Sequence, residues 1–120
     1  MTPDELANQY SNSELWNKTA ALSRLAGNEA LLARIVDMFV EQIGQKQETL
    51  QSAIRANDGE AIRFQSHSIK GIAGDVGADA LRTKAAEMEQ LANLGVLEDM
   101  PDHMSQLNVL VSSTILLMQQ

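Results

Sequence analysis

Residues 64–77 read Phe64-Gln65-Ser66-His67-Ser68-Ile69-Lys70-Gly71-Ile72-Ala73-Gly74-Asp75-Val76-Gly77. On a helical wheel, with about 100° between successive residues, one stripe within roughly 60° of Ile69 collects the buried candidates. Its members are Ile62, Ser66, Ile69, Ala73 and Val76. The spacing predicts an α-helix that buries this stripe and ends at Gly77, because glycine commonly follows a helix C-terminus.

His67 lies roughly 160° from the middle of that stripe, so its imidazole is expected to face solvent. Gly71 and Gly74 follow it on the outward face, where a mid-helix glycine costs about 1 kcal/mol relative to alanine. A face without side chains would let a second protein approach the imidazole closely. Lys70 and Arg63 place two cations within one turn of His67, and such cations suit a transient phosphoryl group.

Plainer explanations apply to each feature alone. An exposed histidine is usually only a solvated surface residue, and two glycines can mark close packing of a neighbouring helix. Lys70 and Arg63 can be ordinary surface charges. The coincidence of all these features on one helix face favours a functional site around His67.

Apolar residues recur at helical spacing through the rest of the chain, and capping residues divide it into helices. The expected helices run from Ser13 to Gly27, from Asn28 to Arg55 or Ala56, from a capping box of Asn57 and Glu60 to about Asp75, from about Leu81 to Gly95, and onward from Asp99. In the second helix the core face is expected to comprise Leu31, Ile35, Met38, Phe39, Ile43, Leu50 and Ile54.

Short connections between the last four helices predict antiparallel neighbours. We therefore expect an all-α fold, an antiparallel up-down-up-down four-helix bundle with an additional short N-terminal helix. Residues 1–12 are polar and lack periodicity, so they are expected to be a linker or a disordered lead-in. One folded domain is expected over residues 13–120, since 120 residues suit a single domain.

Composition excludes several classes of function. The chain has 16 acidic and 9 basic residues, which argues against nucleic-acid binding, and no cysteine that could form a disulfide or a thiolate nucleophile. Neither a phosphate-binding glycine loop nor the Glu-x-x-His pairs of di-metal bundles occur, so an ATP-using kinase and a metal-binding bundle are rejected. The second histidine, His103, is expected to be a surface or partly packed residue.

The segment from His67 to Ala78, followed by Leu81 and Met88-Glu89, resembles the H-x-x-K-G-x-A/S-x-x-x-G-A signature of the histidine phosphotransfer (HPt) domain family. A looser similarity extends over Leu22 to Gln120 and includes Leu25-Ala26-Gly27-Asn28-Glu29 and Phe39. About four-fifths of the chain is covered, and the key positions all match.

The resemblance implies a phosphorelay intermediate of a two-component system, which accepts a phosphoryl group from a receiver-domain aspartate and passes it to another receiver domain. His67 would be the phosphoacceptor, Lys70 would help to hold the phosphoryl oxygens, and Gly71 would leave room for the receiver. The residues expected to dock the partner are Arg63, Phe64, Ser68, Gly71 and Gly74. The domain would have no catalytic activity of its own.

The resemblance also implies transient binding of response-regulator receiver domains by a monomer, with no cofactor on this chain and Mg²⁺ on the receiver. No nucleic-acid or membrane contact is expected. The chain is expected in the cytoplasm, either free or as the C-terminal, cytoplasmic part of a membrane-bound hybrid sensor kinase whose catalytic domain lies elsewhere. The alternative is a helical adaptor or docking bundle that is not phosphorylated.

Overall fold

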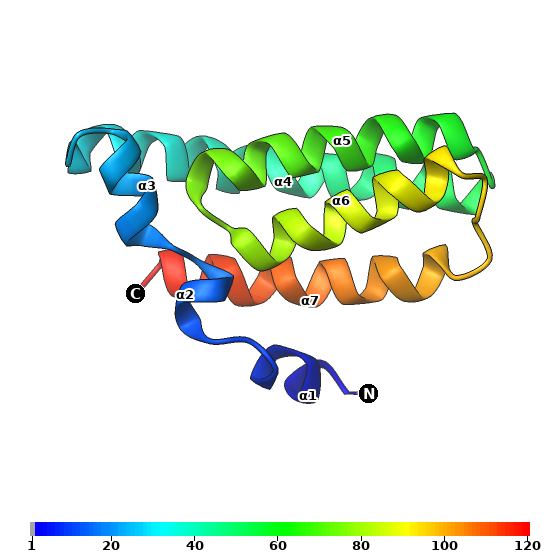
Figure 1. Ribbon diagram of the computed structural model, residues 1–120, viewed down its shortest axis with the longest axis horizontal. Helices are drawn as coiled ribbons and strands as arrows, with labels where there is room; N and C mark the ends of the chain where they lie inside the picture. The colour runs from blue at the N-terminus through cyan, green and yellow to red at the C-terminus, as the bar shows by residue number, and fades with distance from the viewer. Residues whose placement is uncertain (1) are drawn as a thin grey trace.

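The computed structural model describes residues 2–120, in which every regular element is a helix. The helices are α1 (Pro3–Asn8), α2 (Asn12–Leu15), α3 (Lys18–Arg24), α4 (Glu29–Arg55), α5 (Gly59–Val76), α6 (Asp79–Asn93) and α7 (Met100–Met118). The last four are long and lie side by side, whereas α1 to α3 are short and lie at one end and beneath α7 (Figure 1). None of the helices over residues 2–120 is long and apolar enough to cross a membrane.

The four long helices form the predicted antiparallel up-down-up-down bundle. Each packs against the next along the chain, and contacts between α4 and α7 close the bundle. The connections are short: residues 56–58 join α4 to α5, and only Gly77 and Ala78 join α5 to α6. Such short connections force consecutive helices to run antiparallel.

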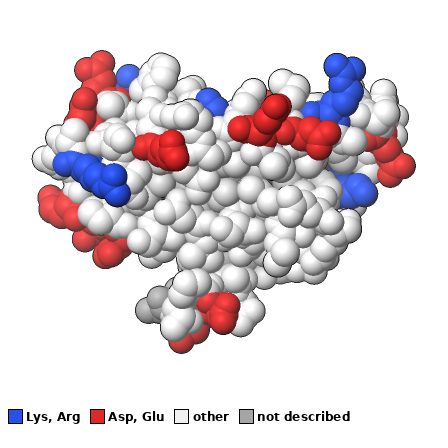
Figure 2. Space-filling view, turned by 180° about the vertical axis from the view of Figure 1, so that it is seen from behind, with Lys and Arg blue, Asp and Glu red and all other residues white. Residues whose placement is uncertain are grey.

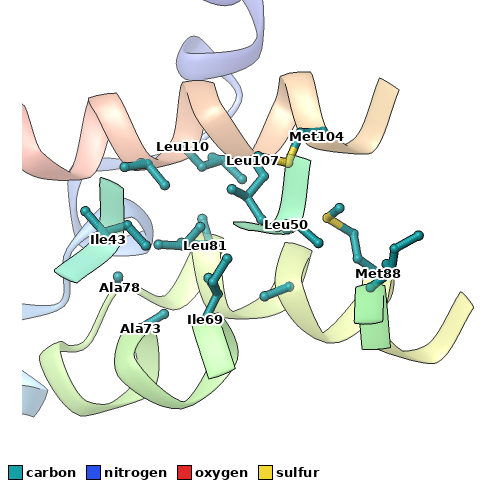
Figure 3. Packing of buried hydrophobic residues seen from close by; sticks show 14 of the residues in the cluster. Ile43, Leu50, Ile69, Ala73, Ala78, Leu81, Met88, Met104, Leu107 and Leu110 are labelled. Carbon is teal, nitrogen blue, oxygen red and sulfur yellow. The ribbon is translucent and has the colours of Figure 1, made fainter. Parts of the chain in front are cut away.

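The core consists mainly of aliphatic and methionine side chains and fills the space between the four long helices (Figure 3). Leu50 of α4, Ile69 of α5, Leu81 of α6 and Leu107 of α7 are all fully buried. Burial of each such side chain contributes about 1.5–3 kcal/mol to the free energy of unfolding. The packing therefore holds α5 in one rotational setting, which determines the side chains that it presents to solvent.

The N-terminal part differs from the prediction. The expected single helix from Ser13 is divided into α2 and α3, and its true N-cap is Ser11, which forms a reciprocal capping box with Glu14. Trp16 interrupts the helix because its backbone is extended, and Asn17 caps α3 instead. The lead-in is not irregular either: α1 occupies residues 3–8 and packs against α7. A role of residues 1–12 as a linker stays a prediction.

Two further details of the helices differ from the prediction. The N-cap of α5 is Asp58, whose carboxylate accepts a hydrogen bond from the Ala61 amide, while Asn57 adopts a left-handed backbone (φ 53°) and ends the preceding turn. Leu31 and Met38 of α4 are exposed rather than buried, with 38% and 55% of their surface accessible. Both lie on the N-terminal half of α4, where the buried face is formed by Leu32, Phe39 and Ile43 instead.

The α2–α3 junction fastens the turn between α5 and α6. The Trp16 indole Nε1 donates a hydrogen bond to the Val76 carbonyl at 2.9 Å, and the Asn17 amide donates one to the Gly77 carbonyl at 2.8 Å. Gly77 has a left-handed backbone (φ 83°), and a Cβ at this position would lie 2.7 Å from the Asn17 carbonyl oxygen. Only glycine therefore fits the turn that orients α5 against α6.

Charged side chains are dispersed over the face turned away from the viewer of Figure 1. On this face, acidic and basic residues are interspersed along the upper half and the two ends, and a broad area below them carries neither (Figure 2). The face offers no concentrated basic surface of the kind that nucleic-acid binding requires.

Candidate functional site

Helix α5 presents His67 to solvent as the wheel predicts. Its buried residues are Ile62, Ser66, Ile69, Ala73 and Val76, the whole of the predicted stripe. The His67 side chain is 65% exposed. The outward placement of His67 is therefore confirmed, and it follows from the packing of α5 against α4 and α6.

Glu89 of α6 joins His67 to Lys70. One carboxylate oxygen, Oε2, lies 2.7 Å from His67 Nδ1, and the other, Oε1, lies 2.6 Å from Lys70 Nζ. The Lys70 ammonium, and to a smaller extent the His67 imidazole, lower the pKa of the Glu89 carboxyl below its ordinary value against an opposing effect of burial. Glu89 is therefore a carboxylate at neutral pH.

This contact determines what each imidazole nitrogen can do. A carboxylate only accepts hydrogen bonds, so the short contact assigns the ring proton to Nδ1. The proton-free nitrogen is then Nε2, which has no hydrogen-bond partner among the described residues. A neutral imidazole with a bare, accessible nitrogen is a nucleophile, and the neighbouring carboxylate stabilises the positive charge that the ring acquires on reaction.

The two glycines of α5 have different surroundings. A Cβ at Gly71 would meet no other atom within 4 Å, so this position is open as predicted. A Cβ at Gly74 would lie 3.3 Å from Cδ of Arg82, a residue of α6. Gly74 therefore accommodates the Arg82 side chain, and the expectation that it leaves a bare face is wrong. Its expected contact with a docked partner stays a prediction.

The other predicted docking residues border His67 along α5. Phe64 is 62% exposed, which is unusual for a phenylalanine. Arg63 is partly buried and forms no ion pair with another described residue. Ser68 accepts a hydrogen bond from the Lys46 ammonium of α4 at 2.7 Å. All three are thus accessible or nearly so, on the helix that carries His67.

An apolar hollow of about 330 Å³ lies at the corner of α3, α4 and α5. The exposed side chain of Met38 lines it together with Ile72 and Gly74 of α5. The hollow thus begins on the C-terminal half of the helix that bears His67, and it gives that end of the helix an apolar border.

His103 lies in a different environment, where α6 meets α7. Its Nδ1 is 3.2 Å from both the Lys84 ammonium and a Glu87 carboxylate oxygen, and its side chain is 19% exposed. Lys84 lowers the pKa of Glu87. The prediction of a partly packed residue is confirmed. Among residues 2–120, no three His, Asp or Glu side chains are grouped so that they could hold a metal ion.

A family model for the Hpt domain matches residues 34–115, which is more than half of the chain and includes α5, α6 and most of α4 and α7. The chain belongs to the Hpt domain family. Hpt domains are phosphotransfer carriers rather than catalysts, and they interact with response-regulator receiver domains in phosphorelays. This Hpt domain thus has a histidine phosphotransfer role in two-component signalling.

The crystal structure of histidine-containing phosphotransfer protein B (HptB) from Pseudomonas aeruginosa PAO1 is similar to this Hpt domain, with a TM-score of 0.77 and 27% sequence identity. The match covers 87% of this chain and 91% of that chain. A comparison with curated proteins found no match. The similarity confirms the helical bundle predicted from periodicity and loop length.

Glu89 belongs to the segment that resembles the family, but its place in the site of this Hpt domain was not predicted. A signal for its position was present. Gly77 and Ala78 form a tight turn between two antiparallel helices, and His67 and Glu89 stand at equal distances along the chain from Ala78. Residues placed symmetrically about such a turn face one another, so the acidic partner of His67 could have been found by counting outwards from the turn.

Proposed function

We propose that His67 is the residue of this Hpt domain that carries the phosphoryl group, with Nε2 as the attacking atom. The observation that supports this most strongly is that only one of the two imidazole nitrogens, Nδ1, is engaged by another side chain. Glu89 engages Nδ1 at 2.7 Å, while the side chain as a whole is 65% exposed. A receiver aspartyl phosphate can therefore approach Nε2 without displacing any side chain of this domain.

In the proposed step, the Nε2 lone pair attacks the phosphorus atom of the receiver's aspartyl phosphate. The N–P bond forms as the P–O bond to the aspartate breaks, and the aspartate leaves as a carboxylate. The ring then holds its Nδ1 proton as an imidazolium, whose charge Glu89 stabilises. In the reverse direction, a receiver aspartate attacks the phosphorus atom, and the N–P bond breaks as Nε2 takes back its electron pair. Because Nδ1 keeps its proton, the ring leaves as a neutral imidazole, so this transfer needs no further group on this chain.

The Lys70 ammonium has two possible anionic partners in the proposed step, the Glu89 carboxylate and the phosphoryl group on His67. Its ammonium now contacts Glu89 at 2.6 Å, and its side chain is 30% exposed. A phosphoryl group on His67, one turn away, offers a stronger anionic partner on the same helix face. We infer that Lys70 neutralises part of that charge. Mg²⁺, which stabilises the in-line transition state, is assigned to the receiver.

Docking is proposed to involve Phe64, Arg63, Ser68 and the open space at Gly71. The contact is inferred to be transient because its apolar part is small, consisting of Phe64 and the border of the hollow that Met38 lines. We further propose a cytoplasmic monomer, either free or as the C-terminal domain of a hybrid sensor kinase. Sedimentation equilibrium of the purified chain tests the monomeric state.

The experiment that tests this function compares two variants during incubation with a phosphorylated receiver. His67→Gln is expected to fold normally, because the side chain is exposed, and to gain no phosphate. His103→Gln is the matched control, and it is expected to retain an acid-labile, base-stable phosphate. Labelling of His67→Gln would contradict the proposal. A parent domain that binds the receiver but gains no phosphate would support the adaptor alternative.

A further inference from the structure

Lys46 is a cation on α4 whose contacts do not balance its charge. Its ammonium donates a hydrogen bond to Ser68 Oγ at 2.7 Å, in a partly buried position. No carboxylate of residues 2–120 lies within ion-pair distance of it. The neutral hydroxyl of Ser68 holds the ammonium in place but leaves it without a counter-charge.

The position of this contact places Lys46 beside the phosphoryl site. Ser68 directly follows His67, and on the wheel of α5 it lies about 100° to one side, whereas Lys70 lies about 60° to the other. The α6 side of His67 carries Lys70 and Glu89, and the α4 side carries Lys46 through Ser68. His67 thus lies between two lysines on the surface of α5, with Lys70 on the α6 side and Lys46 on the α4 side.

The charges on the two flanks differ. In the unphosphorylated domain, Glu89 contacts Lys70 Nζ through Oε1 and His67 Nδ1 through Oε2. The charge of Lys70 is therefore balanced by a carboxylate. A phosphoryl group brings about 1.5 to 2 negative charges at neutral pH. Lys70 can offset at most one of these, and Glu89 competes for it. A second cation would offset more of the added charge, and Lys46 is not paired with an acid among the described residues.

We propose that Lys46 is a second phosphoryl-binding residue, which leaves Ser68 when His67 is phosphorylated and contacts the phosphoryl oxygens from the α4 side. The long, flexible lysine stem allows this movement, since the ammonium needs only to pass from one residue of α5 to its neighbour. The inference rests on the proposed function of His67. It adds a charge from α4, whereas the signature motif around His67 lies entirely on α5 and the turn after it.

The test uses a small phosphodonor in place of a receiver, so that effects on docking do not enter. Potassium phosphoramidate transfers its phosphoryl group to imidazole: its P–N bond breaks, ammonia leaves, and the new N–P bond forms on the ring. A His103→Gln background limits the reaction to one histidine. Phosphorus NMR then follows the phosphoryl resonance as the pH is varied, which gives the pKa of the second ionisation of the phosphoryl group.

Lys46→Met removes the charge at similar length, and it is expected to raise that pKa by about half a unit, the effect of losing one unit charge about 5 Å away in a water-like dielectric. Lys46→Arg should restore the parent value. Arg34→Met, which removes an exposed cation from the same helix, should leave the pKa unchanged. Added salt should reduce the difference between Lys46→Met and the parent.

A coincident titration of Lys46→Met and the parent would overturn this inference, because a lysine that only ties α4 to α5 has no effect on the phosphoryl charge. Such a result would leave the proposed function intact, since the parent would still carry phosphate on His67. If the parent carried no phosphate on His67, the proposed function and this inference would both be wrong. Circular dichroism of each variant verifies that the bundle remains folded.

Discussion

Gly71 lies one turn after His67, and filling this position should separate stability from function. A Cβ at Gly71 would meet no other atom within 4 Å, so a larger side chain would extend into open space. Replacing a mid-helix glycine with glutamine should therefore gain about 0.5–1 kcal/mol in the free energy of unfolding from helix propensity alone. For a chain of this size, the expected rise in Tm is about 2–5 °C.

The same glutamine should obstruct the receiver. Its Cβ would stand about 6 Å from that of His67, on the face that the aspartyl phosphate must approach. We expect phosphotransfer from a phosphorylated receiver to fall by about a hundredfold or more, which corresponds to about 3 kcal/mol or more in the barrier. Gly71→Ala, which adds only a methyl group, should gain similar stability and lose much less of the rate.

Thermal unfolding followed by circular dichroism gives the Tm, and the initial rate of label transfer from a phosphorylated receiver gives the functional effect. Gly44→Gln is the matched control, because Gly44 is also a mid-helix glycine with no atom within 4 Å of its Cβ position. On the wheel of α4 it lies about 160° from Lys46 and so faces away from α5. A lower Tm for Gly71→Gln than for the parent, or an equal loss of transfer in both glutamine variants, would show that Gly71 does not face an open docking surface.

Three further predictions concern Glu89, Gly77 and Ser66. Glu89→Ala should slow phosphotransfer by about ten- to a hundredfold, measured as the single-turnover rate, because the Nδ1 proton and the imidazolium lose their acceptor. Because the pKa of Glu89 is lowered by Lys70 and His67, the stability that its contacts contribute is present above about pH 4.5 and is lost as the pH falls through the folded-state pKa. The difference in free energy of unfolding between the parent and Glu89→Gln should accordingly vanish on acidification in urea titrations, and a difference that grew would contradict this assignment. Gly77→Ala should lower the free energy of unfolding by about 2–4 kcal/mol, because it adds a clash with Asn17 to the cost of a left-handed backbone. Gly95→Ala is the control, since Gly95 also has a positive φ but open space around its Cβ position, and it should lose only about 1 kcal/mol. Similar losses in both variants would show that the clash with Asn17 is relieved. The Ser66 hydroxyl is buried without a hydrogen-bond partner among the described residues, so Ser66→Ala should raise the Tm by a few degrees. A lower Tm for Ser66→Ala would show that the hydroxyl does have a hydrogen-bond partner.

The buried stripe of α5 could be predicted from sequence because it depends only on local periodicity. Each of its five residues is buried, and the position of His67 opposite follows from the same wheel. The turn at Gly77 could be predicted for a similar reason, since glycine is the residue that tolerates a left-handed backbone at a helix end. These features require no knowledge of which helix packs against which.

The features that escaped prediction depend on contacts between distant segments. Trp16 interrupts the expected N-terminal helix, and its indole bonds to the Val76 carbonyl, which is 60 residues away in the chain. Gly74 accommodates Arg82, a residue of the next helix, although its own wheel position is outward. Glu89 completes the site from α6. In each case local periodicity gives the direction of a side chain but not the neighbour that it meets.

A single imidazole nitrogen, Nε2 of His67, is proposed to carry the phosphoryl group. The most direct measurement is to map the phosphate on the intact chain after incubation with a phosphorylated receiver, by phosphorus NMR and by mass spectrometry of peptides kept at alkaline pH. We predict one acid-labile, base-stable phosphate, located on His67 and bonded to Nε2. A phosphate on His103, on His67 Nδ1 or on an acid-stable hydroxyl group would show that the assignment to Nε2 is wrong.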